Sequence, residues 1–401
     1  MAFSFSPIRK DPKTGARTGI VTTPHGSFHT PAFVTVGTLA TVRALSSQDL
    51  NDLGVEVALA NTYHLHLRPG GKIIGKMGGL HGFMSFQKPL FTDSGGFQAF
   101  SLGFGMEHGT GKIGGFFPDE GFQKQPQAEK WARVDGDGVT FRNPITGEKT
   151  RLTPEISIRI QHDLGADIML AFDECTSPLH DYSYTKESLE RTHRWAERCI
   201  TSHKKNRKQS LWGIVQGGVW KDLREESARF ISSLPFEGYA IGGSLGDKSK
   251  TQMHDILEWT VPLLEREKPV HLLGIGAVED IFNSIERGID TFDCVSPTRL
   301  ARHGYLFLTP KSGGSPENKF RMAIKHKEYQ LDKGPIDRHC SCSTCKTYSR
   351  AYLRHLFLAN ELSYFRLASI HNLHFFLRLM EAIRESIGKG RFLQLKKAWL
   401  G

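Results

Sequence analysis

The stretch Thr291-Phe292-Asp293-Cys294-Val295-Ser296-Pro297-Thr298-Arg299 sets the pattern on which the rest of the chain is built. It begins as a short apolar segment that suits a strand, reaches a carboxylate, and continues through a turn to an arginine. A second stretch, residues 91–98, has the same plan, with Asp93 followed by a glycine turn and an aromatic ring. Because both aspartates follow a strand, we expect them to meet in one pocket.

Short apolar runs rich in β-branched residues recur along the first three quarters of the chain. Eight of them are candidate strands: 33–38, 55–62, 90–94, 167–174, 211–216, 239–244, 271–276 and 291–296. Their nearly continuous hydrophobicity is typical of strands buried on both faces, as in a parallel sheet. The segments between them have helical spacing, namely 154–164, 186–204, 221–233, 251–267 and 278–288. This alternation predicts an α/β protein with a (β/α)8 TIM barrel, and a doubly wound open sheet is the alternative.

Two regions depart from the alternating pattern. Residues 102–130 contain many Gly and Pro without periodicity, which predicts a long loop or lid within the region 102–150. Residues 139–141 and 150–152 flank a turn-forming sequence and predict a hairpin.

The barrel pattern ends near Leu308, so we expect a catalytic barrel over residues 1–309. The remainder, residues 310–401, holds a cysteine cluster, a helix over about 362–387 and a basic tail. We expect it to form a metal-binding subdomain whose helices pack on the barrel.

Composition limits the kind of protein. The chain has 401 residues, 39% of them hydrophobic, which suits one large folded domain with an appendage. Its net charge of +10 favours a polyanionic partner such as nucleic acid. No apolar run approaches the ~20 residues of a membrane span, and the N-terminus lacks a signal-peptide pattern. We therefore expect a cytoplasmic protein.

The active site of a barrel of this kind lies at the carboxyl ends of its strands. Those ends carry three carboxylates, an amide and two glycine turns: Asp93, Asp173, Gln216-Gly217-Gly218, Gly242-Gly243 and Asp293. A single Asp at a strand end is more often a helix cap, but capping explains three of them poorly. Glycines expose backbone N–H groups, an ionised Asp accepts from two adjacent donors, and Phe97 suits stacking on a planar ring. A nucleophilic carboxylate with an acid/base carboxylate is the pair that displaces a group from a sugar C1′. This rim therefore predicts glycosyl chemistry on a nucleobase.

Three of the six cysteines, Cys340, Cys342 and Cys345, lie within six residues. In a chain without an export signal this crowding indicates metal rather than a disulfide. A tetrahedral structural Zn2+ needs a fourth ligand, for which we choose His371. The other candidates for that position are His339, His355 and His374. The remaining cysteines are Cys175, Cys199 and Cys294, which we expect in the core. Cys175 follows a rim carboxylate and is therefore also a candidate to line the pocket.

The chain resembles the tRNA-guanine transglycosylases, also called queuine tRNA-ribosyltransferases. The matching stretches follow one another along nearly the whole chain: Asn61-Thr62-Tyr63-His64-Leu65 with Arg68-Pro69-Gly70, 91–98, Phe172-Asp173-Glu174-Cys175, Val215-Gln216-Gly217-Gly218, 239–243, Leu273-Gly274-Ile275-Gly276, 292–299, and the cysteine cluster with His371-Asn372. The resemblance implies a transferase that exchanges guanine at the wobble position of GUN-anticodon tRNAs (Asp, Asn, His, Tyr) for a 7-deazaguanine, preQ1 or queuine. It also implies one structural Zn2+ per chain and a homodimer.

The resemblance further implies roles for individual residues. Asp293 is expected to be the nucleophile that forms a covalent ribosyl-enzyme, and Asp93 the proton acceptor for the incoming base. Base binding is expected from Asp93, Ser94, Gly95, Gly96, Phe97, Asp173, Gln216 and Gly243. Contacts to the RNA near the anticodon are expected from Gly274, Ile275, Gly276, Ala277, Val278, Glu279, Asp280, Thr298, Arg299, Leu300, Ala301 and Arg302.

Some features depart from the family pattern. Gly246 stands where bacterial relatives carry a bulkier residue, and Lys248 where they carry a glutamate that suits the aminomethyl cation of preQ1. Queuine therefore remains an alternative to preQ1. Residues 102–130 look longer than in the family.

Two other functions remain as alternatives. The first is a non-catalytic RNA-binding partner, which the presence of both Asp93 and Asp293 disfavours. The second is a glycosidase acting on carbohydrate, for which we expect more Trp and Glu at the strand ends than the chain has.

Overall fold

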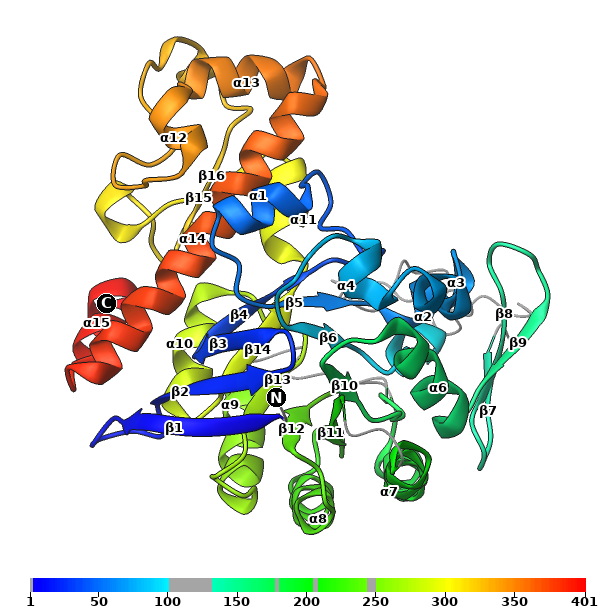
Figure 1. Cartoon of the computed structure of the whole chain (residues 1–401). Helices are drawn as coiled ribbons and strands as arrows, with labels where there is room; N and C mark the ends of the chain where they lie inside the picture. The colour runs from blue at the N-terminus through cyan, green and yellow to red at the C-terminus, as the bar shows by residue number, and fades with distance from the viewer. Residues whose placement is uncertain (1–2, 101–131, 177–179, 205–207, 244–249) are drawn as a thin grey trace.

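The computed structural model describes residues 3–100, 132–176, 180–204, 208–243 and 250–401 (Figure 1). Eight parallel strands close into a barrel in the order β10-β11-β12-β13-β14-β4-β5-β6. Their bounds are β4 (Ala32–Val36), β5 (Ala58–Ala60), β6 (Leu90–Thr92), β10 (Ile168–Leu170), β11 (Ser210–Val215), β12 (Gly238–Ile241), β13 (Val270–Leu272) and β14 (Thr291–Cys294). All eight predicted strands are confirmed, and the pairing of β6 with β10 excludes the open sheet.

Side chains at alternate strand positions fill the interior of the barrel. Trp212, Phe91 and Ile168 belong to this inner cluster, whereas Phe292 and Leu272 point outward into the layer beneath the helices. The Phe91 ring stacks on His271, with ring centroids 5.4 Å apart, so both side chains lie inside the barrel. Since successive residues of a strand alternate between faces, the residues two positions beyond Phe91 and Thr291 also face inward.

An N-terminal sheet that the sequence pattern does not predict closes the amino end of the barrel. It consists of the antiparallel strands β1 (Ser4–Lys10), β2 (Arg17–Thr23) and β3 (Gly26–Thr30). Val21 and Phe28 are fully buried and join the interior cluster of the barrel.

A network of two histidines and a buried aspartate joins this N-terminal sheet to the barrel. Asp167 accepts hydrogen bonds from His25 Nδ1 at 2.7 Å, His81 Nε2 at 3.1 Å and the Leu90 N–H at 3.0 Å. Burial alone raises the pKa of Asp167, but the hydrogen bonds from His81 and His25 bring it below its usual value. The two rings stack at an interplanar angle of 16°, so their in-plane lone pairs cannot converge on one metal ion. We interpret this network as structural.

The helices that cover the barrel are α6 (Pro154–Leu164), α7 (Tyr182–His203), α8 (Lys221–Ser233), α9 (Lys250–Thr260) and α10 (Val278–Glu286). The Thr153 hydroxyl caps α6 by accepting from the Ile156 N–H. The prediction of one helix over 251–267 is wrong at its end. The α-helix stops at Thr260 and continues only as the 3-10 turn η2 (Val261–Leu263), because Pro262 has no N–H to donate and its ring clashes with the preceding turn.

Smaller elements lie around the first half of the barrel. The predicted hairpin is confirmed as β8 (Val139–Arg142) and β9 (Lys149–Leu152), and β7 (Ala132–Val134) extends it into a three-stranded sheet. The short helices are α1 (Ser47–Asp52), α2 (Thr62–Leu67), α3 (Gly71–Lys76) and α4 (Gly79–Phe83). The loop predicted over 102–130 lies outside the described residues.

The chain after the barrel forms a largely helical unit that reaches back to it. It comprises α11 (Ser296–Arg302), β15 (Tyr305–Phe307), η3 (Pro310–Ser312), β16 (Arg321–Ala323), η4 (Lys327–Leu331), α12 (Ser343–Thr347), α13 (Arg350–Leu358), α14 (Leu362–Gly388) and α15 (Phe392–Leu400). The long helix α14 packs against α11, β15 and the barrel strand β4 (Figure 1). None of the described helices has the length and apolar character that a bilayer span requires.

Candidate active site

Asp93 and Asp293 both face into the carboxyl end of the barrel. Asp93 comes two residues after the inward-facing Phe91, and Asp293 hydrogen-bonds to His271, whose ring stacks on Phe91. This chain of contacts connects the two aspartates across the barrel. Their charges also interact, because the negative charge of Asp293 contributes to the raised pKa of Asp93.

Asp93 is held by the start of helix α2. The Thr62 N–H donates to its Oδ1 at 2.8 Å, and the Asn61 amide donates to its Oδ2. Burial raises the pKa of Asp93 to about 7, and the charge of Asp293 adds to this rise against the lowering effect of the hydrogen bonds. A carboxyl group with this pKa exchanges protons near neutral pH, as a general base requires.

Asp293 is oriented by two contacts that fall on the same oxygen. The Gly274 N–H donates to Oδ1 at 3.0 Å, and His271 Nε2 lies 3.1 Å from it. His271 is fully buried, and its Nδ1 lies 2.9 Å from the Thr291 hydroxyl. The Asp293 side chain keeps 16% of its surface exposed. The aspartate is therefore fixed through Oδ1 while its side chain stays accessible.

Asp173 and Gln216 form a second polar group on the rim. Gln216 Nε2 donates to Asp173 Oδ2 at 2.7 Å, and the Ser94 hydroxyl donates to Asp173 Oδ1 at 3.2 Å. Burial raises the pKa of Asp173 to about 6 despite these hydrogen bonds. Asp173 thus remains largely an acceptor at neutral pH, suited to a ligand edge with N–H groups.

Glycines allow the backbone to approach Asp173 and Gln216 closely. A Cβ placed on Gly96 would lie 2.7 Å from the Asp173 carbonyl oxygen. Gly243 has a φ of 104°, which favours glycine, and a Cβ there would lie 2.9 Å from Gln216 Oε1. Of the residues predicted to bind the base, Ser94, Gly96, Asp173, Gln216 and Gly243 lie close together at one end of the barrel. Gly246 and Lys248 lie outside the described residues.

The two segments predicted to contact RNA flank the active-site rim. The first follows β13 and runs into α10, and Gly274 within it donates to Asp293. The second is α11, where Arg302 donates to the Thr298 carbonyl at 2.8 Å and Arg299 is exposed. Burial lowers the pKa of Arg302, and the positive charges of Arg43 and Arg299 lower it further. A phosphate between these arginines would relieve their repulsion.

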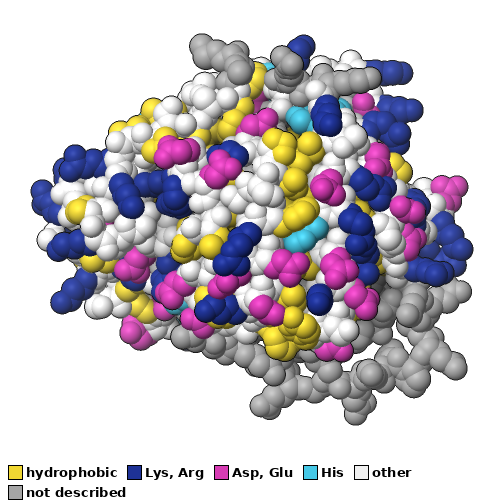
Figure 2. Space-filling model, turned by 90° about the horizontal axis from the view of Figure 1, so that it is seen from below, with side chains coloured by type: hydrophobic (Ala, Val, Ile, Leu, Met, Phe, Trp, Pro, Cys, Tyr) yellow, Lys and Arg dark blue, Asp and Glu magenta, His cyan; other side chains and the backbone are white. Residues whose placement is uncertain are grey.

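Figure 2 shows the charged side chains on the face seen from below. Around the strip of apolar side chains in the middle of this face, Lys and Arg are interspersed with Asp and Glu. The described residues there do not form a continuous basic surface.

The predicted metal ligands converge where α12 meets helix α14. His371 Nδ1 lies 3.6, 3.7 and 3.3 Å from the sulfurs of Cys340, Cys342 and Cys345. Tetrahedral zinc with ordinary bond lengths needs S···N separations of about 3.5 Å, so the four atoms fit that ion. His371 Nε2 lies 2.7 Å from the Phe307 carbonyl oxygen, which leaves Nδ1 facing the thiols. This group can hold a metal ion.

The histidines considered as alternatives to His371 are placed differently. His374 Nδ1 lies 3.4 Å from Cys340 Sγ, but its other nitrogen faces the Ser341 hydroxyl at 3.3 Å. The four-atom metal group of the described residues contains His371 and excludes His374, His339 and His355.

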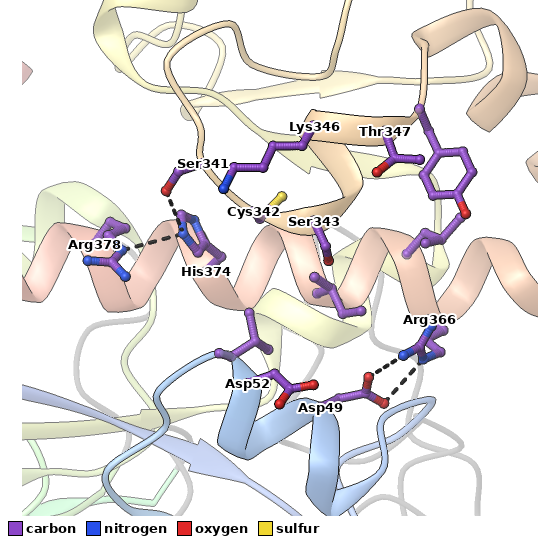
Figure 3. Close-up of a pocket in the computed structure, with 14 residues that line it drawn as sticks. Asp49, Asp52, Ser341, Cys342, Ser343, Lys346, Thr347, Arg366, His374 and Arg378 are labelled. Carbon is purple, nitrogen blue, oxygen red and sulfur yellow. Dashed lines mark hydrogen bonds and ion pairs between the residues drawn. The ribbon is translucent and has the colours of Figure 1, made fainter.

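A cavity of about 520 Å³ lies between the metal-binding group, α14 and α1 (Figure 3). Arg366 on α14 forms an ion pair with Asp49 on α1, with its Nε 3.2 Å from Oδ2. His374, Ser341 and Lys346 line the other side. The ion pair fastens the metal-binding region to the first part of the barrel.

Several residues at the site were not singled out from the sequence. His271 lies on β13, and it contacts Asp293 because β13 pairs with β14. This pairing cannot be read from the order of residues in the sequence. Asn61 precedes a short helix that the strand pattern does not indicate, and Arg43 lies in a loop far from Arg302 in the sequence. A polar residue in an otherwise apolar strand, as His271 is in β13, is a signal that could have identified the first of them.

Known proteins resemble this chain along almost its full length. The family model described as queuine tRNA-ribosyltransferase matches residues 11–401. A putative queuine tRNA-ribosyltransferase from Archaeoglobus fulgidus is 56% identical over 391 residues, covering 96% of each chain. Queuine tRNA-ribosyltransferases from Bacillus velezensis (46% identity, 96% of this chain and 92% of the relative) and Thermoanaerobacter sp. strain X514 (44% identity, 99% and 96%) are also similar.

Proposed function

Since the chain belongs to the queuine tRNA-ribosyltransferase family, whose enzymes modify guanine in tRNA, we propose that it exchanges the wobble guanine of GUN-anticodon tRNAs for a 7-deazaguanine. The tRNAs are those for Asp, Asn, His and Tyr, and the incoming base is preQ1 or queuine. The observation that carries this proposal is the pair of coupled carboxylates, Asp93 and Asp293, at one end of the barrel.

The two aspartates act in succession. Asp293 attacks C1′ of the ribose, the bond from C1′ to guanine breaks, and the purine leaves with the bonding electron pair. Both contacts to Asp293 fall on Oδ1, so we assign the attack to Oδ2. The incoming base then displaces Asp293 from the same carbon while Asp93 accepts its N–H proton. Two inversions retain the configuration at C1′.

The base lies among the rim residues. Asp173 accepts from the N–H edge of the purine, and the Gly243 N–H and Gln216 amide face its carbonyl side. Gln216 donates to Asp173, and we propose that the N–H edge of the purine takes the place of this donor. Phe97 stacks on the ring, with Ser94, Gly95 and Gly96 forming the wall beside it.

The remaining assignments follow the same model. The RNA, with its target base flipped out, contacts the segment from Gly274 to Asp280 and the segment from Thr298 to Arg302. We further propose a structural Zn2+, a division into a barrel (1–309) and a zinc-binding subdomain (310–401), a homodimer, and action in the cytoplasm.

Base exchange itself provides the test. Purified enzyme incubated with labelled guanine and a GUN-anticodon tRNA transcript is expected to incorporate label at the wobble base only. A transcript with adenine at that position is the matched control. Competition with unlabelled preQ1 and queuine then identifies the incoming base. Absence of incorporation into the GUN transcript contradicts the proposal.

The raised pKa of Asp93 predicts a pH dependence of the second half-reaction. Because Asp93 must be ionised to accept a proton, kcat/KM for the incoming base is expected to rise with pH up to the pKa of Asp93 in the covalent intermediate and to level off above it. Initial rates between pH 5.5 and 8.5 measure this profile. Asp93→Asn is expected to lose the rising limb together with most activity, and a wild-type profile that is flat over this range contradicts the assignment.

A further inference from the structure

A buried arginine that pairs with no carboxylate of the described residues lies next to the proposed base site. Arg224 on α8 is fully buried. Its Nε donates to the Gly218 carbonyl at 2.7 Å, and its Nη1 donates to the carbonyls of Gly242 at 2.8 Å and Val215 at 3.2 Å. No carboxylate in the described part of the chain is paired with it. These three bonds join the ends of β11 and β12.

The Arg224 guanidinium keeps its charge. Burial lowers the pKa of Arg224 to about 10, which still leaves the group protonated at neutral pH. Its electrostatic neighbour is Cys175, whose thiol is neutral because burial raises its pKa to about 12. Among the described residues, a full positive charge is therefore held in a low-dielectric region without an anion beside it, an arrangement that costs free energy and often marks a functional site.

The third nitrogen of Arg224 points toward the base site. Nη2 is buried and has no hydrogen-bond partner among the described residues, and the same holds for Gln216 Oε1. A Cβ placed on Gly243 would lie 2.8 Å from Nη2 and 2.9 Å from Gln216 Oε1. Nη2 therefore lies on the same side of Gly243 as Gln216 Oε1, next to the two groups assigned to the carbonyl side of the purine.

We propose that Arg224 is a positioning residue that places a fixed positive charge next to the carbonyl edge of the purine and stabilises the purine anion during base exchange. This inference rests on the proposed function. When C1′ bonds to Asp293, the electron pair of the broken glycosidic bond passes to the purine and spreads over the ring to its carbonyl oxygen. The incoming base carries the same charge as its N–H proton passes to Asp93. A preorganised charge lowers the energy of both states without moving.

The test varies the acidity of the incoming base. In a double-displacement reaction, kcat/KM for the base reports only the second half-reaction. 7-Deazaguanine forms a less stable anion than guanine, and 8-azaguanine forms a more stable one. Arg224→Gln is expected to lower kcat/KM by roughly 10²-fold for 7-deazaguanine and by much less for 8-azaguanine. The wild-type enzyme is expected to depend less steeply on base acidity.

The controls separate this role from a structural one. Arg229→Gln removes an exposed arginine of the same helix, which pairs with Glu225 at 3.2 Å, and is expected to leave the rates for both bases unchanged. If circular dichroism shows that Arg224→Gln does not fold, Arg224→Lys is compared on the same two bases. Lysine keeps the positive charge but displaces it, so a larger loss for 7-deazaguanine than for 8-azaguanine is again expected. Equal losses for both bases overturn the inference while leaving the proposed function intact. Failure of the wild-type enzyme to exchange any base overturns both.

Discussion

Replacement of Asp293 by asparagine is expected to lower the rate of base exchange by on the order of 10⁴-fold or more. The amide is a poor nucleophile, and it cannot carry the negative charge that the attacking oxygen brings to C1′. Its shape is almost unchanged, so the contacts with His271 and Gly274 are expected to keep the fold intact. Initial rates of guanine incorporation measure the loss.

Detection of the covalent intermediate provides a second, independent test of the Asp293→Asn variant. Wild-type enzyme mixed with tRNA and denatured at once is expected to show a protein–RNA adduct on a gel, and Asp293→Asn is expected to show none. Glu258→Gln, which alters a carboxylate paired with Arg287 on the surface, is the control that keeps both the adduct and the exchange rate. An adduct formed by Asp293→Asn places the nucleophile elsewhere.

The barrel could be predicted from the sequence because its strands are buried on both faces. Such strands read as continuous apolar runs, and the carboxylates that end them stand out, as at Asp93 and Asp293. The N-terminal sheet was harder to predict, since β1 is largely exposed and lacks that signature. The end of α9 was misjudged because helical spacing continues past Pro262, where the backbone cannot follow.

The supporting side chains of the site depend on neighbours that sequence order does not give. Arg224 lies in a helix with charged residues on both sides, as in Asp222-Leu223-Arg224-Glu225, and so reads as an exposed position. Only the packing of α8 against β11 buries it. His271 likewise matters because β13 pairs with β14 and brings it beside Asp293.

Loss of the metal is expected to have the largest effect on stability. Cys342→Ser removes one thiolate from the group formed with Cys340, Cys345 and His371. Because a structural metal binds the folded state, its loss is expected to lower the free energy of unfolding of this region by about 4 kcal/mol or more. Urea unfolding measures the free energy of unfolding, and mass spectrometry measures the zinc content. Cys199→Ser makes the same change at a buried cysteine on α7 and is expected to keep the zinc.

The metal-binding region is also connected to α11, the segment proposed to contact RNA, which makes the prediction specific. His371 contacts the Phe307 carbonyl, and the next residue, Asn372, accepts from the Phe307 N–H at 3.0 Å and donates to the Pro297 carbonyl at 2.9 Å. Pro297 lies at the start of α11, which carries Arg299 and Arg302. Loosening α14 therefore disturbs the proposed RNA contact before it reaches Asp93. Zinc removal by a chelator is expected to raise KM for tRNA more than KM for the base. An equal rise in both constants would show that the metal supports the whole barrel rather than the α11 segment.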